Sequence, residues 1–181
     1  MRRADSLTII FETHSTSLDN EARLASGHAD TDLSPGGERQ AIELGARRRA
    51  DRLDVVYASD LRRSWRTAEI AFATSSIAIV RDARLRECDY GLLSRHPVAE
   101  IDALRDKAIN DSFPGGESYA QVVVRVAAWL DDTRSRGHQQ VLVIGHRATQ
   151  YSLEHLVVGV PLVEAVRRSF RWQPGWVYEL P

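Results

Sequence analysis

Leu7-Thr8-Ile9-Ile10-Phe11 is a short apolar run, and Glu12-Thr13-His14-Ser15-Thr16-Ser17 follows it directly. Three more short runs rich in β-forming residues come later in the chain: Asp54-Val55-Val56-Tyr57, Ile77-Ala78-Ile79-Val80 and Val141-Leu142-Val143-Ile144. The first, second and last of the four runs are almost continuously apolar, which is typical of strands covered by helices on both faces of a sheet. They therefore predict buried strands in a layered fold.

Helical patterns separate these runs. The range 36–49 places apolar residues on one side and arginines on the other, with Ser34 as the expected N-cap and Pro35 in the first turn. Further helices are expected over 61–72, 118–136 and 147–158. Strands that alternate with helices predict an α/β fold, a three-layer sandwich with a mainly parallel sheet. The range 170–178 resembles two short strands around a Pro-Gly turn, and we expect one antiparallel edge strand there.

Length and composition narrow the class of protein. A chain of 181 residues corresponds to a single domain, 1–181, and 43% hydrophobic with 27% charged residues indicates a globular protein. The net charge of −1 argues against a dedicated binder of nucleic acid or anionic membranes, which needs a basic face. The single cysteine, Cys88, excludes an intramolecular disulfide and a zinc site built of cysteines. The charged residues 1–5 and the short apolar run behind them do not form a signal peptide or a membrane span, so we expect a cytoplasmic protein.

Polar residues follow each predicted strand at the point where it ends. Ligands of parallel α/β sheets bind at the carboxyl ends of the strands, so these segments are the candidates for a site. They are the ranges 12–17, 58–63, 85–91 and 145–149, which together carry two histidines, several arginines and a glutamate. The sequence therefore predicts that His14, His146 and Glu87 meet arginine side chains at one edge of the sheet.

This set of side chains suits a phosphate better than a metal ion. His14, His146 and Glu87 could form a three-ligand metal site, but no HxH, HxxxH or HExxH spacing occurs, and nearby arginines would repel a cation. Arginines favour a phosphate, which accepts paired N–H donors. The chain has no GxxxxGK loop, which argues against use of a nucleoside triphosphate. A histidine beside such an arginine can attack phosphorus, while a neighbouring carboxylic acid protonates the leaving alcohol and later activates water.

Six motifs occur in an order and spacing that resemble one known family. They are Thr13-His14-Ser15-Thr16-Ser17-Leu18-Asp19-Asn20; Gly27 with Leu33-Ser34-Pro35-Gly36-Gly37-Glu38-Arg39-Gln40-Ala41; Ser59-Asp60-Leu61-Arg62-Arg63-Ser64-Trp65-Arg66-Thr67-Ala68; Leu85-Arg86-Glu87 with Gly91; Pro114-Gly115-Gly116-Glu117-Ser118; and Val141-Leu142-Val143-Ile144-Gly145-His146. Nearly the whole chain thus resembles the histidine phosphatase superfamily, with its phosphoglycerate-mutase-like fold. This resemblance implies that His14 is the nucleophile, that Arg63 and His146 hold the phosphoryl group, and that Glu87 is the general acid and then the base.

The resemblance also implies residues that border the substrate, namely Thr13, Ser17, Asn20 and Gly27. Two departures from the family pattern concern the first motif. Thr13 stands where the family has an arginine, and Ser15 stands where it has a glycine. The chain resembles a subgroup that has Glu-Thr-His at this place. We hypothesise that Arg147, which directly follows His146, supplies the positive charge that Thr13 lacks.

These observations predict a phosphatase that hydrolyses small phosphomonoesters through a phosphohistidine, without a metal ion or cofactor. The segment between Gly91 and Pro114 has 22 residues, shorter than the corresponding insertion of the family's mutases, which favours a phosphatase and an open pocket. Two alternatives stay open: a degenerate member that binds a phosphorylated ligand without turnover, and an enzyme recruited to non-phosphate chemistry. We expect a small phosphorylated substrate as the partner, with no nucleic acid and no membrane; whether the chain forms a homodimer is left open.

Overall fold

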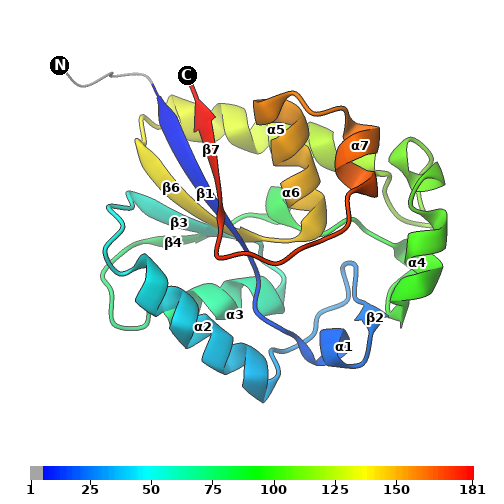
Figure 1. Cartoon of the computed structure of the whole chain (residues 1–181), viewed down its shortest axis with the longest axis horizontal. Helices are drawn as coiled ribbons and strands as arrows, with labels where there is room; N and C mark the ends of the chain where they lie inside the picture. The colour runs from blue at the N-terminus through cyan, green and yellow to red at the C-terminus, as the bar shows by residue number, and fades with distance from the viewer. Residues whose placement is uncertain (1–5) are drawn as a thin grey trace.

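A five-stranded sheet forms the centre of the computed structural model, which describes residues 6–181 (Figure 1). The strand order is β4-β3-β6-β1-β7, and the strands are β1 (Leu7–Thr13), β3 (Val55–Ala58), β4 (Ile79–Arg81), β6 (Gln140–Gly145) and β7 (Trp176–Leu180). All neighbouring pairs are parallel except β1 with β7, which is antiparallel. The predicted α/β fold, with a mainly parallel sheet and one antiparallel edge strand, is confirmed.

Helices cover both faces of the sheet (Figure 1). On one face lie α2 (Pro35–Arg48) and α3 (Arg62–Ala71), and on the other lie α5 (Tyr119–Ser135) and α6 (Arg147–Leu153). Alternate residues of the central strands serve the two faces: Ile9 and Phe11 join the core beneath α5, whereas Ile10 joins the core beneath α2 and α3. This burial on both faces explains why the strands are almost continuously apolar.

The long helices begin where the sequence places their caps. Ser34 accepts a hydrogen bond from the Gly37 amide at the start of α2, and Ser118 forms a capping box with Gln121 at the start of α5. The predicted helix 147–158 is an α-helix only to Leu153 and continues as a π-helical segment, η4 (Glu154–Val158). It is followed by α7 (Leu162–Arg167).

Short elements surround the carboxyl ends of the strands, and each is too short to show a helical or strand period in the sequence. They are α1 (Leu18–Glu21), β2 (Leu24–Ala25), η1 (Ala83–Leu85), η2 (Gly91–Leu93), β5 (His96–Pro97), α4 (Val98–Leu104) and η3 (Lys107–Ile109). β2 and β5 pair as a separate two-stranded sheet, which joins the segment after β1 to the segment before α4. The chain from η2 to η3 therefore forms a compact cap beside the site.

The C-terminal segment differs from its prediction. The range 170–178 does not form two strands around a turn; only β7, from Trp176, is a strand. The residues before it run in irregular conformation from α7 across the molecule to β7 (Figure 1). Their partners are side chains, since Arg48 donates to the carbonyl of Pro174 at 2.9 Å. The charged start of the chain, residues 1–5, for which the sequence predicts no signal peptide, lies outside the described residues.

Candidate active site

Parallel pairing of β1 with β6 brings the two predicted active-site histidines together. Thr13 is opposite Gly145 in the strand register, and the His14 amide donates to the Gly145 carbonyl at 3.0 Å. The rings of His14 and His146 consequently lie with their centroids 4.9 Å apart and their planes tilted by 55°. Residues 132 positions apart in sequence thus share one site because each directly follows the end of its strand.

The His14 ring is held in a defined tautomer. Its Nδ1 lies 2.7 Å from the Ser15 carbonyl oxygen, which can only accept, so Nδ1 carries the proton and Nε2 keeps a free lone pair. Burial and the positive charge of Arg63 lower the pKa of His14 to about 3. The imidazole is therefore neutral at neutral pH, which is the form required of a nucleophile.

Arg63 is the cation that acts on His14. It lies in the first turn of α3, and only 2% of its surface is exposed. Its guanidinium donates to the carbonyls of Ala29 at 3.1 Å and Gly27 at 2.8 Å, which fixes its orientation. Burial lowers the pKa of Arg63, but a guanidinium remains charged at any physiological pH. Arg63 can therefore bind an anion with its remaining N–H groups.

Glu87 follows η1 (Ala83–Leu85) in the chain, and its carboxylate contacts the first turn of α6, which directly follows His146. Its Oε1 accepts hydrogen bonds from the backbone amides of Cys88 at 2.8 Å and Ala148 at 3.2 Å. Both bonds are made by the same oxygen, so Oε2 is available for proton exchange with a substrate. This arrangement suits a general acid and base whose position is fixed by the backbone.

A network beneath Glu87 holds its main chain. Arg125, on α5, donates to the carbonyls of Arg84, Arg86 and Glu87 at 2.7, 2.8 and 2.9 Å. The same guanidinium forms two hydrogen bonds of 3.0 Å with the carboxylate of Glu117. We call Arg125 and Glu117 the carbonyl clamp. Sequence reasoning assigned no role to Arg125, and no local pattern marks it.

His28 also contacts this segment. Its Nε2 lies 2.8 Å from the Glu87 carbonyl oxygen, and its ring is within 3.8 Å of the carboxylates of Asp89 and Glu117. The His28 side chain therefore joins the Gly27 loop to the backbone of Glu87.

His146 is buried more deeply than His14. Only 1% of its surface is exposed, and within the described residues neither ring nitrogen has a hydrogen-bond partner. Burial, together with the charge of Arg63, lowers its pKa well below the ordinary value. A neutral ring with one N–H and no protein partner is suited to donate a hydrogen bond to a bound ligand.

One cavity of about 640 Å³ contains all four predicted catalytic residues. Its volume is that of an ordinary small-molecule site. Its wall also includes charged and aromatic residues that the sequence analysis did not single out for the site: Glu12, Arg47, Tyr90, Arg105, Tyr151 and Trp172. Trp172 is 61% exposed. Glu12 and Tyr90 lie in the strand-end segments 12–17 and 85–91, whereas the other four residues lie outside such segments and are placed only by the folded chain.

The predicted substrate-binding residues divide into two groups. Thr13, Asn20 and Gly27 line the cavity, whereas Ser17 does not. The correction for Ser17 has a local cause: its hydroxyl accepts from the Asn20 amide and caps α1, so it serves the backbone.

Arg147 lines the same cavity as His14 and Arg63, and its compensation for Thr13 stays a prediction. Its guanidinium carbon is 5.4 Å from the ring centre of Tyr151 and 5.1 Å from that of Phe170. It also donates to the Arg168 carbonyl at 3.4 Å. Arg147 therefore anchors the C-terminal segment to α6, and Arg63 is the arginine whose charge lowers the pKa of His14.

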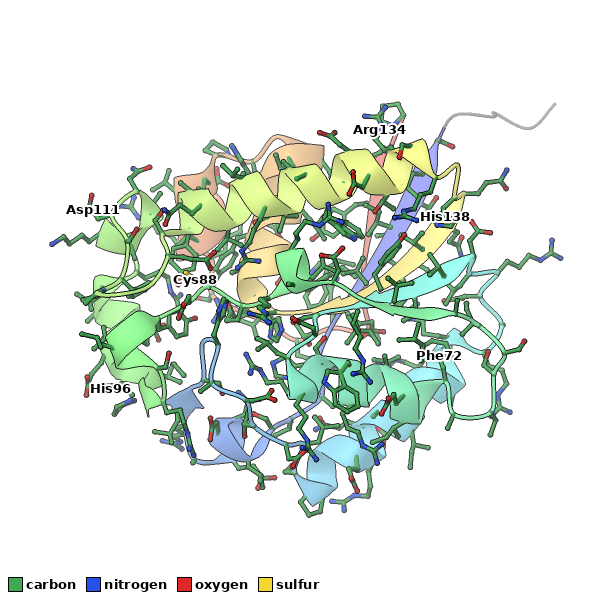
Figure 2. The ribbon with its side chains drawn as sticks, turned by 180° about the vertical axis from the view of Figure 1, so that it is seen from behind. Phe72, Cys88, His96, Asp111, Arg134 and His138 are labelled. Carbon is green, nitrogen blue, oxygen red and sulfur yellow. The ribbon has the colours of Figure 1, made fainter. Side chains whose placement is uncertain are left out.

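Two of the remaining histidines lie away from the four candidate catalytic residues. His96 and His138 are on opposite sides of the view in Figure 2, one in the cap and one before β6. Cys88 is buried, and burial with the nearby charge of Glu87 raises its pKa, so the thiol is an unreactive packing group. In residues 6–181 no cluster of three metal-ligating side chains occurs, and no helix there is long and apolar enough to cross a membrane.

The chain belongs to the histidine phosphatase superfamily (branch 1), whose family model matches residues 9–179. It is 32% identical over 164 residues to a probable phosphoglycerate mutase of Erwinia tasmaniensis, covering 86% of this chain and 76% of that protein. It is 33% identical over 164 residues to phosphoserine phosphatase 1 of Hydrogenobacter thermophilus, covering 85% and 77%. The class of protein is therefore a hydrolase or phosphotransferase of this superfamily.

Solved structures agree with the fold. Bacillus stearothermophilus YhfR matches with a TM-score of 0.83 at 24% identity, over 94% of this chain and 90% of that one. A mycobacterial glucosyl-3-phosphoglycerate phosphatase with VO3 bound matches with a TM-score of 0.76 at 22% identity, over 98% and 93%. The phosphoglycerate-mutase-like fold is confirmed.

Proposed function

We propose that the chain is a phosphatase that hydrolyses small phosphomonoesters through a phosphohistidine at His14, without a metal ion. The observation that carries this proposal is the neutral His14 ring with a free Nε2 lone pair beside the charged, buried Arg63. A nucleophile next to a fixed cation is the arrangement that phosphoryl transfer requires.

In the first step Nε2 of His14 attacks phosphorus, and the bond from phosphorus to the ester oxygen breaks. Glu87 gives its proton to that oxygen, so the alcohol leaves uncharged. Arg63 and the N–H of His146 stabilise the charge on the phosphoryl oxygens. In the second step Glu87 takes a proton from water, the hydroxide oxygen bonds to phosphorus, and His14 leaves as a neutral imidazole.

Two experiments with the purified protein test this proposal. Brief reaction with a ³²P-labelled phosphomonoester, followed by denaturation, should leave an acid-labile, base-stable label on the wild type and none on His14→Ala. Release of inorganic phosphate from a panel of phosphomonoesters should persist in EDTA. A His14→Ala protein labelled to the same level as the wild type would show that His14 is not the nucleophile.

The same panel separates the phosphatase from the alternatives. Binding of phosphorylated compounds without phosphate release, in wild type and His14→Ala alike, would indicate a ligand-binding member of the family. Transfer of the label to an added alcohol or phosphorylated acceptor, in preference to water, would indicate a mutase-type phosphotransferase.

A further inference from the structure

One short loop connects the cation of the site to its acid. Arg63 donates from one guanidinium nitrogen to the Gly27 carbonyl at 2.8 Å and from another to the Ala29 carbonyl at 3.1 Å. The residue between these two carbonyls is His28, and its Nε2 lies 2.8 Å from the Glu87 carbonyl oxygen. The backbone on either side of His28 therefore holds Arg63, while its ring holds the main chain of Glu87.

The contact made by His28 requires a donor at one particular atom. A carbonyl oxygen only accepts, so Nε2 carries the proton of this hydrogen bond. The other ring nitrogen, Nδ1, faces the Asp89 carboxylate at 3.6 Å. His28 is absent from the cavity wall, so it does not contact a substrate bound there. Any effect of His28 on the reaction must pass through Arg63 or Glu87.

The Glu87 carbonyl oxygen accepts from two segments of the chain. Arg125 donates to it at 2.9 Å and His28 at 2.8 Å, and these two bonds occupy both lone pairs of the oxygen. The other bonds of Arg125 go to the segment before Glu87 and to its partner in the carbonyl clamp. Of these two donors, only His28 also belongs to the loop that holds Arg63.

The loop is anchored at both ends of this connection. Asp30, the next residue along, accepts from the Arg62 amide at 2.7 Å and so caps α3, whose own N-cap residue makes no side-chain bond. At the other end, Gly27 packs closely on the segment that carries the acid, because a Cβ built on this glycine would lie 3.1 Å from the Tyr90 amide nitrogen. A shift of the loop is therefore resisted from both sides.

We infer that His28 is a positioning residue that sets the separation between Arg63 and Glu87. This inference rests on the proposed function, in which Arg63 binds the phosphoryl oxygens and Glu87 protonates the leaving oxygen. All of these oxygens are bonded to the same phosphorus, so the cation and the acid must keep a fixed spacing for both contacts to form in one transition state. The hydrogen bond from His28 joins the supports of the two groups and holds that spacing.

This role implies a double effect that the carbonyl clamp does not have. Loss of the bond between His28 and Glu87 releases the loop on which Arg63 rests, and it also releases the backbone of the acid. It should therefore weaken the binding of phosphate and slow the departure of a poor leaving group. Loss of Arg125 releases the acid alone, so it should leave the binding of phosphate unchanged.

His28→Asn and His28→Gln form a matched pair for the test, because both replace the ring by an uncharged amide and differ in reach. The amide nitrogen of glutamine takes the place of Nε2, whereas that of asparagine takes the place of Nδ1 and falls short of the Glu87 carbonyl. For His28→Asn we expect the inhibition constant of inorganic phosphate to rise about threefold or more, and kcat for an alkyl phosphate to fall about tenfold, with a smaller loss for p-nitrophenyl phosphate. His28→Gln should stay close to the wild type in both quantities.

His138→Asn is the control, since this histidine lies before β6 and outside the cavity wall (Figure 2), and it should leave both quantities unchanged. Equal values for His28→Asn and His28→Gln, in an active enzyme, would overturn the positioning role and leave the phosphatase intact. A lower kcat for His28→Asn with an unchanged inhibition constant would also overturn it, because the bond would then serve Glu87 alone. A wild type that releases no phosphate from either ester would overturn the proposed function and this role together.

Discussion

Glu87 illustrates how a single carboxylate acquires a directed role. One oxygen is occupied by two backbone amides, and the other is left to exchange a proton. A short loop motif marks Glu87 as a candidate acid. The orientation of its carboxylate, however, depends on the Ala148 amide, 61 positions away in sequence. A side chain held in this way contributes to the transition state more than to ground-state binding.

Glu87→Gln should therefore lower kcat about 10²–10⁴-fold and change KM little. The amide keeps an oxygen acceptor for the two backbone N–H groups but has no proton to give. The loss should shrink for a substrate with a good leaving group, such as p-nitrophenyl phosphate, compared with an alkyl phosphate. Steady-state kinetics with both substrates check this; an equal loss for both would contradict the role of Glu87 as a general acid.

At the scale of elements, α5 and the loop before it position that acid from below. In the carbonyl clamp, the Arg125 guanidinium donates to three backbone carbonyls within residues 84–87, and the Glu117 carboxylate orients the guanidinium. A buried, charge-assisted network of this type is rigid only when every member is present. Glu87 therefore depends on a helix that contributes no residue to the proposed chemistry.

Arg125→Met should lower kcat for alkyl phosphates more than for p-nitrophenyl phosphate, because a displaced acid matters most when the leaving group is poor. KM should change little, since Arg63 and His146 are untouched, and Arg125→Lys should recover part of the rate. Arg134→Met is the matched control, because this exposed arginine lies near the opposite end of α5 (Figure 2). An equal rate loss for both leaving groups would indicate a general structural effect.

The close packing of α2 against α3 requires a glycine at position 45. A Cβ built on Gly45 would lie 2.1 Å from the Ala71 carbonyl oxygen, so the two helices meet at the glycine backbone. Gly36, on the same helix, has no neighbour nearer than 3.6 Å to such an atom. The two glycines look alike in the sequence, and only the helix contact distinguishes them.

Gly45→Ala should destabilise the fold by about 1–3 kcal/mol, because α2 must move away from α3. Gly36→Ala should be neutral or stabilising by up to about 1 kcal/mol, since it meets no backbone and restricts the unfolded chain. Urea unfolding of both variants against wild type measures the difference. Equal stabilities for the two variants would show that α2 and α3 adjust without cost.

At the scale of the whole molecule, the two buried histidines of the site make the free energy of unfolding depend on pH. The folded protein holds His14 and His146 neutral, with the pKa of His14 lowered from 6.5 to about 3 and that of His146 also lowered. Between pH 6.5 and about 3, His14 is protonated in the unfolded chain but neutral in the folded chain. Stability is therefore complete above pH 6.5 and is lost as the pH falls toward about 3.

Wild type should lose more stability than His14→Gln when the pH is lowered from 7 to 5, by up to about 2 kcal/mol. Glutamine cannot be protonated, so it removes one contribution to the pH dependence and leaves that of His146. Free energies of unfolding in urea at both pH values provide the measurement. Identical losses in the two proteins would mean that His14 titrates normally in the folded state.

The layered α/β fold, four strands of the central sheet, the long helices and the four candidate catalytic residues could be predicted from the amino-acid sequence. These features depend on local signals: apolar runs, helical spacing, caps and residues that directly follow strands. Parallel pairing brings the carboxyl ends of the strands to the same edge of the sheet, so the residues that follow them meet in one site. Positions at strand ends made His14, Glu87 and His146 candidates, while the resemblance to the family's motifs singled out Arg63 and assigned the four roles; the cavity contains all four residues.

The surroundings of those residues could not be predicted and follow from how the chain packs. The capping role of Ser17, the stacking of Arg147 on Phe170, the clamp made by Arg125 and the placement of Trp172 in the cavity wall all depend on contacts between segments distant in sequence or on alternative partners for one side chain. A local pattern indicates that a residue is polar or aromatic, but not which of several partners it contacts. That choice is made when the cap, α5 and the C-terminal segment pack around the strand ends, because close packing leaves each side chain one arrangement.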